Sequence, residues 1–151
     1  PGTGDVQLTL SQLIPIDGAV VVTTPQDVAF ADVRRAIRMF ELTKVPVMGL
    51  VENMSYFVAP DTQNRYDIFG ESRTAAHCES LSVPLLAELP IDMQVGPSGD
   101  RGEPVCVADP DGEQAGLYAS VAKKVIALLA KSDSMESFQD FFSKKSSDQS
   151  A

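Results

Sequence analysis

Residues 18–40 have the sequence GAVVVTTPQDVAFADVRRAIRMF, in which a strand, a turn and an amphipathic helix follow one another. The run from Val20 to Val22 is typical of a parallel strand that helices cover on both faces. Thr24 is the expected N-cap of the helix, and Pro25 is its expected first residue, where the missing N–H costs nothing. Apolar residues then recur at helical spacing, with arginines and acids on the other side. This stretch therefore predicts a central strand followed by a helix that packs on the sheet.

The rest of the chain continues this alternation. Residues 45–54 and 84–89 are predicted to be two further buried strands, joined by right-handed parallel crossovers. Residues 55–70 are expected to form an excursion above the sheet, such as a hairpin. The other expected elements are helices over 6–14, 71–81 and 111–130, a short helical turn over 91–95 and a Gly- and Pro-rich loop over 96–104. Residues 1–130 are thus predicted to form one α/β domain, followed by a mobile tail over residues 131–151.

Composition limits the possible classes of function. The formal net charge of -9 argues against a nucleic-acid-binding surface, and no apolar run approaches the roughly 18 to 20 residues that span a membrane. The two cysteines, Cys78 and Cys106, lie far apart and form no CxxC pair. We therefore expect reduced thiols and a cytoplasmic protein. Because the chain begins with Pro1 rather than Met, we also expect it to be part of a longer protein in which a strand precedes Pro1.

Several short motifs occur in a defined order along the chain: PGTGD (1–5), TTPQ (23–26), ENMSYF (52–57), IFG (68–70) and LPID (89–92). Their combination resembles the Mrp family of iron-sulfur cluster carrier ATPases, relatives of the MinD and ParA group of P-loop proteins. The likeness covers about residues 1–129. It implies a three-layer α/β/α P-loop NTPase fold with a mostly parallel sheet.

The Walker A loop of that family has no counterpart in the sequence, since no GKGGVGK-like run occurs. The resemblance therefore corresponds to the C-terminal part of the domain, with the N-terminal Walker A part missing. Without a phosphate cradle we expect these residues alone not to hydrolyse ATP, and we assign no catalytic residue. Apolar sheet edges are expected to be exposed.

The resemblance implies ATP with Mg²⁺ as the cofactor of the longer protein, bound between the two subunits of a homodimer. The backbone N–H groups of Gly2, Thr3 and Gly4 would face the terminal phosphate, where glycines permit a close approach. The alternative is that these residues form a plain tight turn that caps the next helix.

The same resemblance implies an adenine site. Asn53 ends a buried strand, at the edge of the sheet where ligands collect, and its amide suits the edge of a base. The alternative is that Asn53 caps a turn. The opposite side of the base would be lined by Pro90, Ile91 and Asp92.

The iron-sulfur cargo lacks its usual ligands in this chain. Many family members carry CxxC after NMSYF, whereas Ala59 and Thr62 stand in the corresponding stretch and cannot ligate iron. The chain thus resembles the CxxC-lacking branch; a cluster is possible, but we assign no metal ligand. Cys78, beside His77, and Cys106 are alternative ligands, or else small buried or half-buried residues. Apo iron-sulfur proteins are the implied partners.

Two other functions remain open. The first is a MinD- or ParA-like ATPase that switches a partner or a membrane, with a tail helix as its anchor. The second is a non-enzymatic interaction module on the same fold. Few basic residues in the tail disfavour a membrane anchor. Its apolar residues at roughly helical spacing are Met135, Phe138, Phe141 and Phe142.

Overall fold

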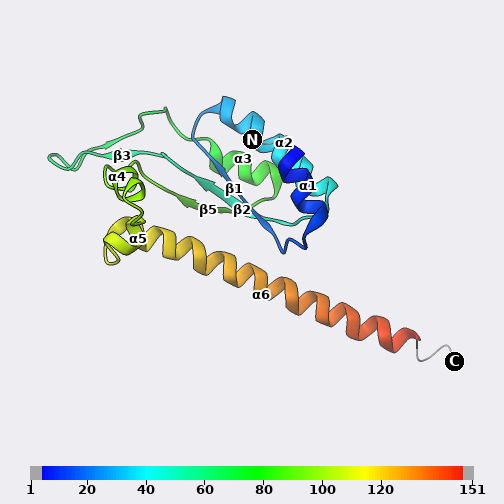
Figure 1. The fold of residues 1–151 in the computed structure, drawn as a ribbon. Helices are drawn as coiled ribbons and strands as arrows, with labels where there is room; N and C mark the ends of the chain where they lie inside the picture. The colour runs from blue at the N-terminus through cyan, green and yellow to red at the C-terminus, as the bar shows by residue number, and fades with distance from the viewer. Residues whose placement is uncertain (1–4, 148–151) are drawn as a thin grey trace.

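The computed structural model describes residues 5–147, with the side chains of residue 6 and of residues 8–131 (Figure 1). Strands and helices alternate along most of this length, as predicted. In chain order the elements are α1 (Asp5–Leu13), β1 (Ala19–Thr23), α2 (Asp27–Leu42), β2 (Val47–Glu52), β3 (Phe57–Val58), β4 (Arg65–Tyr66), α3 (Thr74–Leu81), β5 (Leu85–Glu88), α4 (Val95–Asp100), α5 (Val105–Ala108) and α6 (Glu113–Ser147).

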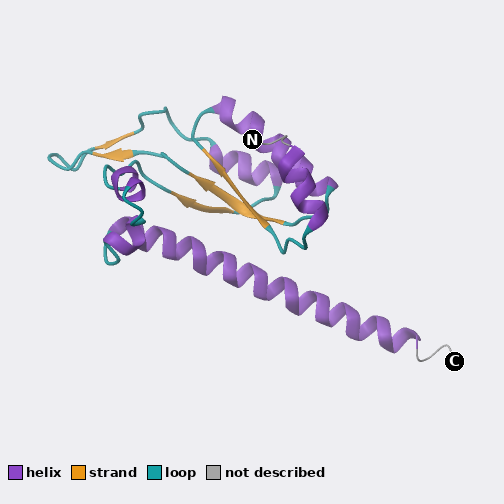
Figure 2. Ribbon diagram, viewed as in Figure 1, coloured by secondary structure: helices purple, strands orange, loops and turns teal. Residues whose placement is uncertain are grey.

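The main sheet has three parallel strands in the order β1-β2-β5 (Figure 2). In its register, Glu52 lies opposite Thr23 on one side and opposite Glu88 on the other. The predicted excursion is a two-stranded antiparallel hairpin, β3–β4, and Phe57 in it forms a parallel bridge with Ile91. The three predicted strands and the hairpin are therefore confirmed.

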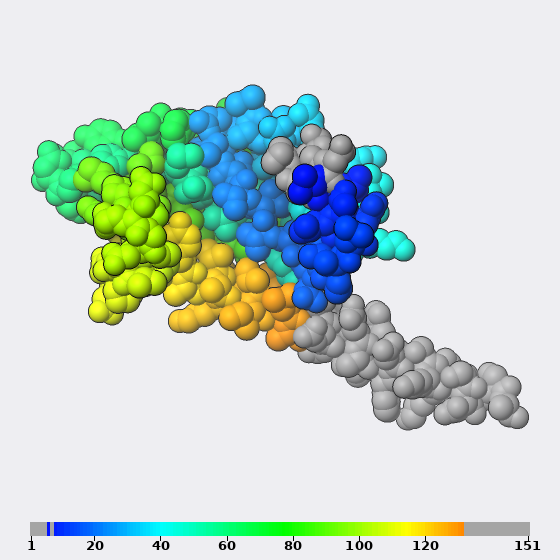
Figure 3. All heavy atoms as spheres, viewed as in Figure 1, coloured from blue at the N-terminus to red at the C-terminus, as the bar shows by residue number. Residues whose placement is uncertain are grey.

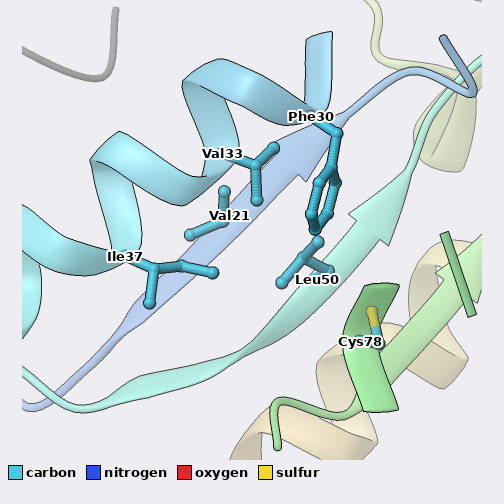
Figure 4. Close-up of a cluster of buried hydrophobic side chains, with 6 residues drawn as sticks. All are labelled: Val21, Phe30, Val33, Ile37, Leu50 and Cys78. Atoms are coloured by element: carbon cyan, nitrogen blue, oxygen red, sulfur yellow. The ribbon is translucent and has the colours of Figure 1, made fainter. Parts of the chain in front are cut away.

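Neighbouring residues of each strand point to opposite faces of the sheet, and both faces are apolar and covered by helices. Leu50 packs on one face in a cluster that α2 and α3 complete (Figure 4); its buried members are Val21, Phe30, Val33, Ile37, Leu50 and Cys78. On the other face Val51 and Leu86 pack against the apolar side of α6, which includes Leu117 and Val121. The resulting three-layer α/β/α architecture is the expected one.

Helix α2 begins later than predicted. Its N-cap is Gln26, whose extended backbone carbonyl accepts hydrogen bonds from Ala29 N at 3.0 Å and Phe30 N at 3.3 Å. The prediction that Thr24 is the N-cap and Pro25 the first helical residue was therefore wrong. The reason is that β1 remains paired as far as Thr23, whose carbonyl accepts the Asn53 N–H at 2.7 Å, so the chain needs the next residues to turn.

The expectations for residues 71–104 and for the last helix also need correction. The short helical turn predicted over 91–95 starts only at Val95, as the beginning of α4, because Ile91 still pairs with the hairpin; α4 then occupies part of the predicted loop. Helix α3 starts three residues later than residue 71, at Thr74. Helix α6 does not end at residue 130 but continues to Ser147. The tail side chains Met135, Phe138, Phe141 and Phe142 lie outside the described side chains, and the mobility of the tail stays a prediction.

Apolar side chains are exposed on β1 and on α1. Val22 on the edge strand β1 is 61% exposed, in line with the expected apolar sheet edge, and Val6 and Leu13 on the helix α1 are also exposed. In the space-filling view α1, in dark blue, lies at the end of the molecule opposite the hairpin, in green (Figure 3). Within residues 5–147, no helix combines the length and the apolar character needed to cross a membrane.

Candidate functional site

The carboxyl ends of the three parallel strands meet at the edge of the sheet that faces the hairpin (Figure 2). Backbone hydrogen bonds continue past the last paired residues. The Asn53 N–H donates to Thr23 O at 2.7 Å, and the Leu89 N–H donates to Glu52 O at 2.7 Å. Residues just after β1, β2 and β5 are thereby held side by side, at the position where open α/β sheets bind ligands.

Asn53 is half-buried at this edge and, with Thr24, lines a groove of about 460 Å³ whose other walls are residues of β1 and α2. Its side-chain oxygen accepts the Met54 N–H at 3.0 Å, a local bond of the kind expected if Asn53 caps a turn. Met54 has φ of 56°, in the left-handed region, so the chain does turn here. The amide nitrogen of Asn53 can donate hydrogen bonds to a ligand, and its oxygen keeps a second lone pair that can accept one.

The segment Pro90, Ile91 and Asp92 lies beside the base of the hairpin. The Ile91 N–H donates to Tyr56 O at 2.7 Å, and Asp92 Oδ1 accepts the Gln94 N–H at 2.6 Å. Asp92 lines a separate cavity of about 340 Å³. Asn53 and this segment therefore share one edge of the sheet, but Asn53 and Asp92 line different cavities.

The phosphate-facing candidates Gly2, Thr3 and Gly4 lie outside the described residues. Their assignment to the terminal phosphate stays a prediction.

Glu52 is a site residue that the sequence reasoning missed. It is 0% exposed, and its carboxylate accepts hydrogen bonds from the hydroxyls of Ser55 and Ser72, each at 2.5 Å. The Ser72 hydroxyl in turn accepts the Thr74 N–H at 3.1 Å, at the start of α3. A signal was present, because a carboxylate ends a strand that is otherwise apolar and buried; a buried charge requires partners nearby.

The two cysteines have different surroundings. Cys78 lies in the core cluster at 3% exposure, and burial, with a smaller effect from the negative charge of Glu52, raises the pKa of its thiol above the ordinary value of 9.0 (Figure 4). A thiol that is buried and held protonated is a poor metal ligand. Cys106 on α5 is exposed, so the interpretation of this residue as a small buried or half-buried one was wrong.

Neither His77 nor the hairpin adds metal ligands to these thiols. The His77 ring stacks on Phe30 with centroids 4.0 Å apart and lies 3.3 Å from an Asp27 oxygen, whereas Cys78 points into the core. Ala59 and Thr62 lie at the hairpin turn, where Ala59 N donates to Asn64 O at 3.0 Å. Among the residues that the structure describes, no group of three or more His, Cys, Asp or Glu side chains could hold a metal ion.

A family model described as the NUBPL iron-transfer P-loop NTPases, within the ParA group, matches residues 1–126. The chain belongs to this family. The match confirms the resemblance to the Mrp-type carriers, and the NUBPL family fold agrees with the α/β/α layers found here.

Named relatives of this NUBPL-family chain carry related descriptions. An iron-sulfur cluster carrier protein from Deinococcus radiodurans is 52% identical over 130 residues, which are 86% of this chain and 37% of that protein. An iron-sulfur cluster carrier protein from Aquifex aeolicus is 47% identical over 82% of this chain and 34% of its own length. The iron-sulfur cluster transfer protein NUBPL of Dictyostelium discoideum is 43% identical over 85% of this chain and 40% of its own length. The chain thus spans less than half the length of each of these relatives.

Solved structures show the same fold. A nucleotide-binding protein from Archaeoglobus fulgidus, solved in complex with ADP, aligns with a TM-score of 0.64 and 38% identity over 76% of this chain and 46% of that one. The cell division ATPase MinD from Pyrococcus furiosus aligns with a TM-score of 0.59 and 20% identity over 74% of this chain and 43% of that one. The second likeness concerns the fold alone.

Proposed function

We propose that the longer protein containing these residues is an ATP-binding iron-sulfur cluster carrier, and that this chain supplies the adenine-facing edge of its nucleotide site. The observation that carries the proposal is the position of Asn53. Its amide lies at the carboxyl end of β2, next to the end of β5, in a chain of the NUBPL family. We assign the adenine to this edge, between Asn53 and the segment Pro90, Ile91 and Asp92.

The donor set of this edge fits an adenine ring. The NH₂ group of Asn53 offers donors, one of which suits a ring nitrogen of the base, while the Asn53 oxygen accepts the Met54 N–H. The exocyclic amino group of adenine needs an acceptor, and a backbone carbonyl of the 90–92 segment can supply one. ATP, when bound with Mg²⁺, supplies the phosphoanhydride bond whose hydrolysis drives the conformational change of the carrier. For the terminal phosphate we retain Gly2, Thr3 and Gly4 as the proposed contacts.

The 151 residues contain no GKGGVGK-like run, so we expect them alone not to hydrolyse ATP. Hydrolysis is assigned to the longer protein, acting as a homodimer in the cytoplasm. The iron-sulfur cluster is cargo, destined for apo iron-sulfur proteins. Cys78 is buried and the hairpin carries no thiol, so Cys106 is the candidate ligand from the described residues, and further ligands must come from elsewhere in the assembly.

The test of base recognition is Asn53→Ala in the full-length protein, with ADP and GDP titrated by calorimetry. Loss of one neutral hydrogen bond is worth about 0.5–1.5 kcal/mol, so ADP affinity should fall roughly 2- to 12-fold, and the preference for ADP over GDP should fall with it. The matched control is Asn64→Ala, at the exposed turn of the hairpin, which should change neither quantity. An unchanged ADP-to-GDP preference in Asn53→Ala would remove the assigned role.

The carrier function is tested by anaerobic iron-sulfur reconstitution of the full-length protein. We expect a visible cluster absorbance, with transfer to an apo-acceptor that depends on ATP. A colourless protein that still binds and hydrolyses ATP would point instead to a switch ATPase that acts on partners.

A further inference from the structure

Glu52 is the buried charge that the proposed function does not use. Its side chain is 0% exposed at the last position of β2, inside a strand whose other residues are apolar or glycine apart from this end. Burying a carboxylate costs several kcal/mol unless hydrogen bonds compensate, and an apolar residue of similar size would avoid that cost. Stability alone therefore does not explain why a carboxylate, rather than an apolar side chain, occupies this position.

The hydrogen bonds of Glu52 join the two ends of the hairpin excursion. Ser55 lies at its start, three residues after Glu52, and Ser72 lies two residues past its end at residue 70, twenty residues after Glu52. Both hydroxyls donate to the same carboxylate, one to each of its oxygens. One side chain thus closes the whole excursion at its base and, through the Ser72 contact with Thr74 N, also holds the start of α3.

Asn53 lies between the residues that this carboxylate fixes. On its N-terminal side Glu52 is held in the sheet, and on its C-terminal side Ser55 is held both by the carboxylate and by a bond from its N–H to Leu89 O at 2.9 Å. The short turn through Asn53 and Met54 is therefore tied at both ends. A side chain on such a turn is ordered before a ligand arrives, which removes part of the entropy cost of binding.

We propose that Glu52 is a positioning residue for the nucleotide site: its carboxylate, bonded to Ser55 and Ser72, holds the turn that presents Asn53 to the base. The inference rests on the proposed function, because it assumes that Asn53 contacts the nucleotide. Glu52 itself contacts no ligand in this scheme. Its effect on binding passes through the two serines and the backbone of residues 52–55.

The first test is Glu52→Gln in the full-length protein. The amide keeps the size of the side chain, but only one of its two terminal atoms can accept a hydroxyl proton, so one serine loses its acceptor. ADP affinity should fall, by no more than the roughly 2- to 12-fold expected for Asn53→Ala, because Glu52 acts only by positioning Asn53, and the preference for ADP over GDP should fall in parallel. A purely structural role would lower the melting temperature but leave that preference unchanged in the folded protein.

The matched control is Glu88→Gln. Glu88 is the register partner of Glu52 on β5 and lies at the same edge, but it is only half-buried, and its side chain makes no hydrogen bond to the described residues. This variant should bind ADP as the unmodified protein does. Asn53→Ala supplies the second comparison: in that background, Glu52→Gln should change ADP affinity less than twofold, because the two residues act through one contact.

The serines keep the test decisive if Glu52→Gln does not fold. Ser72→Ala removes one hydroxyl at a point distant in sequence from Asn53, so a loss of ADP affinity in this variant supports the positioning role. The positioning role would be overturned if a folded Glu52→Gln protein kept the ADP affinity and base preference of the unmodified protein. The same result in the Ser55→Ala/Ser72→Ala double variant would also overturn it. If Asn53→Ala weakens ADP binding while these variants do not, this inference fails and the proposed function stands; if Asn53→Ala also has no effect, both fail.

Discussion

Replacing Gly49 by alanine tests how closely β2 and β5 must approach to form the edge that carries Asn53 and Pro90. A Cβ atom at residue 49 would lie 2.6 Å from Leu86 Cγ and 2.7 Å from Pro84 O. Both distances are well below van der Waals contact. The Leu86 side chain can rotate away, but Pro84 O cannot, because it accepts the Leu50 N–H at 2.9 Å in a bond that joins the two strands.

The expected cost follows from these contacts. Overpacking a well-packed site costs about 1–3 kcal/mol, and weakening the strand-to-strand hydrogen bond adds about 0.5–1.5 kcal/mol. Gly49→Ala should therefore lower the free energy of unfolding by about 2–4 kcal/mol. For a chain of this size that corresponds to a fall of roughly 4–16 °C in Tm.

The assay is thermal and urea unfolding followed by circular dichroism, with Gly116→Ala as the matched control. A Cβ at Gly116 on α6 meets no atom within 4 Å, so this substitution should be neutral or stabilising by up to about 1 kcal/mol, through helix propensity. A Gly49→Ala protein as stable as its parent would refute the reasoning, since it would mean that β2 and β5 can separate without cost.

The thiols and the alkaline stability provide further predictions. A bulky thiol reagent should label one cysteine per native chain, Cys106, and should reach Cys78 only after unfolding; equal labelling rates would contradict the burial of Cys78. Burial and the Glu52 charge raise the folded-state pKa of Cys78, so the unfolded chain loses its thiol proton first as the pH rises. The protonated Cys78 thiol therefore contributes fully to the free energy of unfolding below pH 9.0, and this contribution declines above pH 9.0. Cys78→Ala should therefore show a shallower loss of stability above pH 9.0 in chemical unfolding, and an unchanged slope would contradict the shift.

The architecture was predictable because its signals are local and repeated. The valine run of β1 and the apolar run of β2 specify buried parallel strands, and the intervening amphipathic helix fixes the crossover between them. Element boundaries were predicted less well because pairing between distant strands decides them. The bond from Asn53 N to Thr23 O keeps β1 extended past the point where Thr24 could have capped a helix.

The candidate site was predictable only in part. Asn53 was located from its place at the carboxyl end of a buried strand, whereas the segment at 90–92 was located only through the family resemblance; the structure brings both to one edge of the sheet. Asn53 and Asp92 line different cavities, the first walled mainly by β1 and α2 and the second by α4, α5 and the start of α6, and Ile91 pairs with the hairpin. No local pattern in the sequence predicts that pairing.

The burial of the Glu52 carboxylate conflicts with the apolar pattern of its strand, and a functional role would explain that conflict. The strand pattern asks for an apolar residue at this position, and burial makes a charge costly, yet the register places a carboxylate there at full burial. The apolar strand pattern and the cost of burying a charge, each taken alone, both disfavour a glutamate here. Together with the two serines it makes a closed set of hydrogen bonds whose geometry depends on the excursion between them. Natural chains retain such departures mainly where a site must be held in place, and this one directly precedes Asn53.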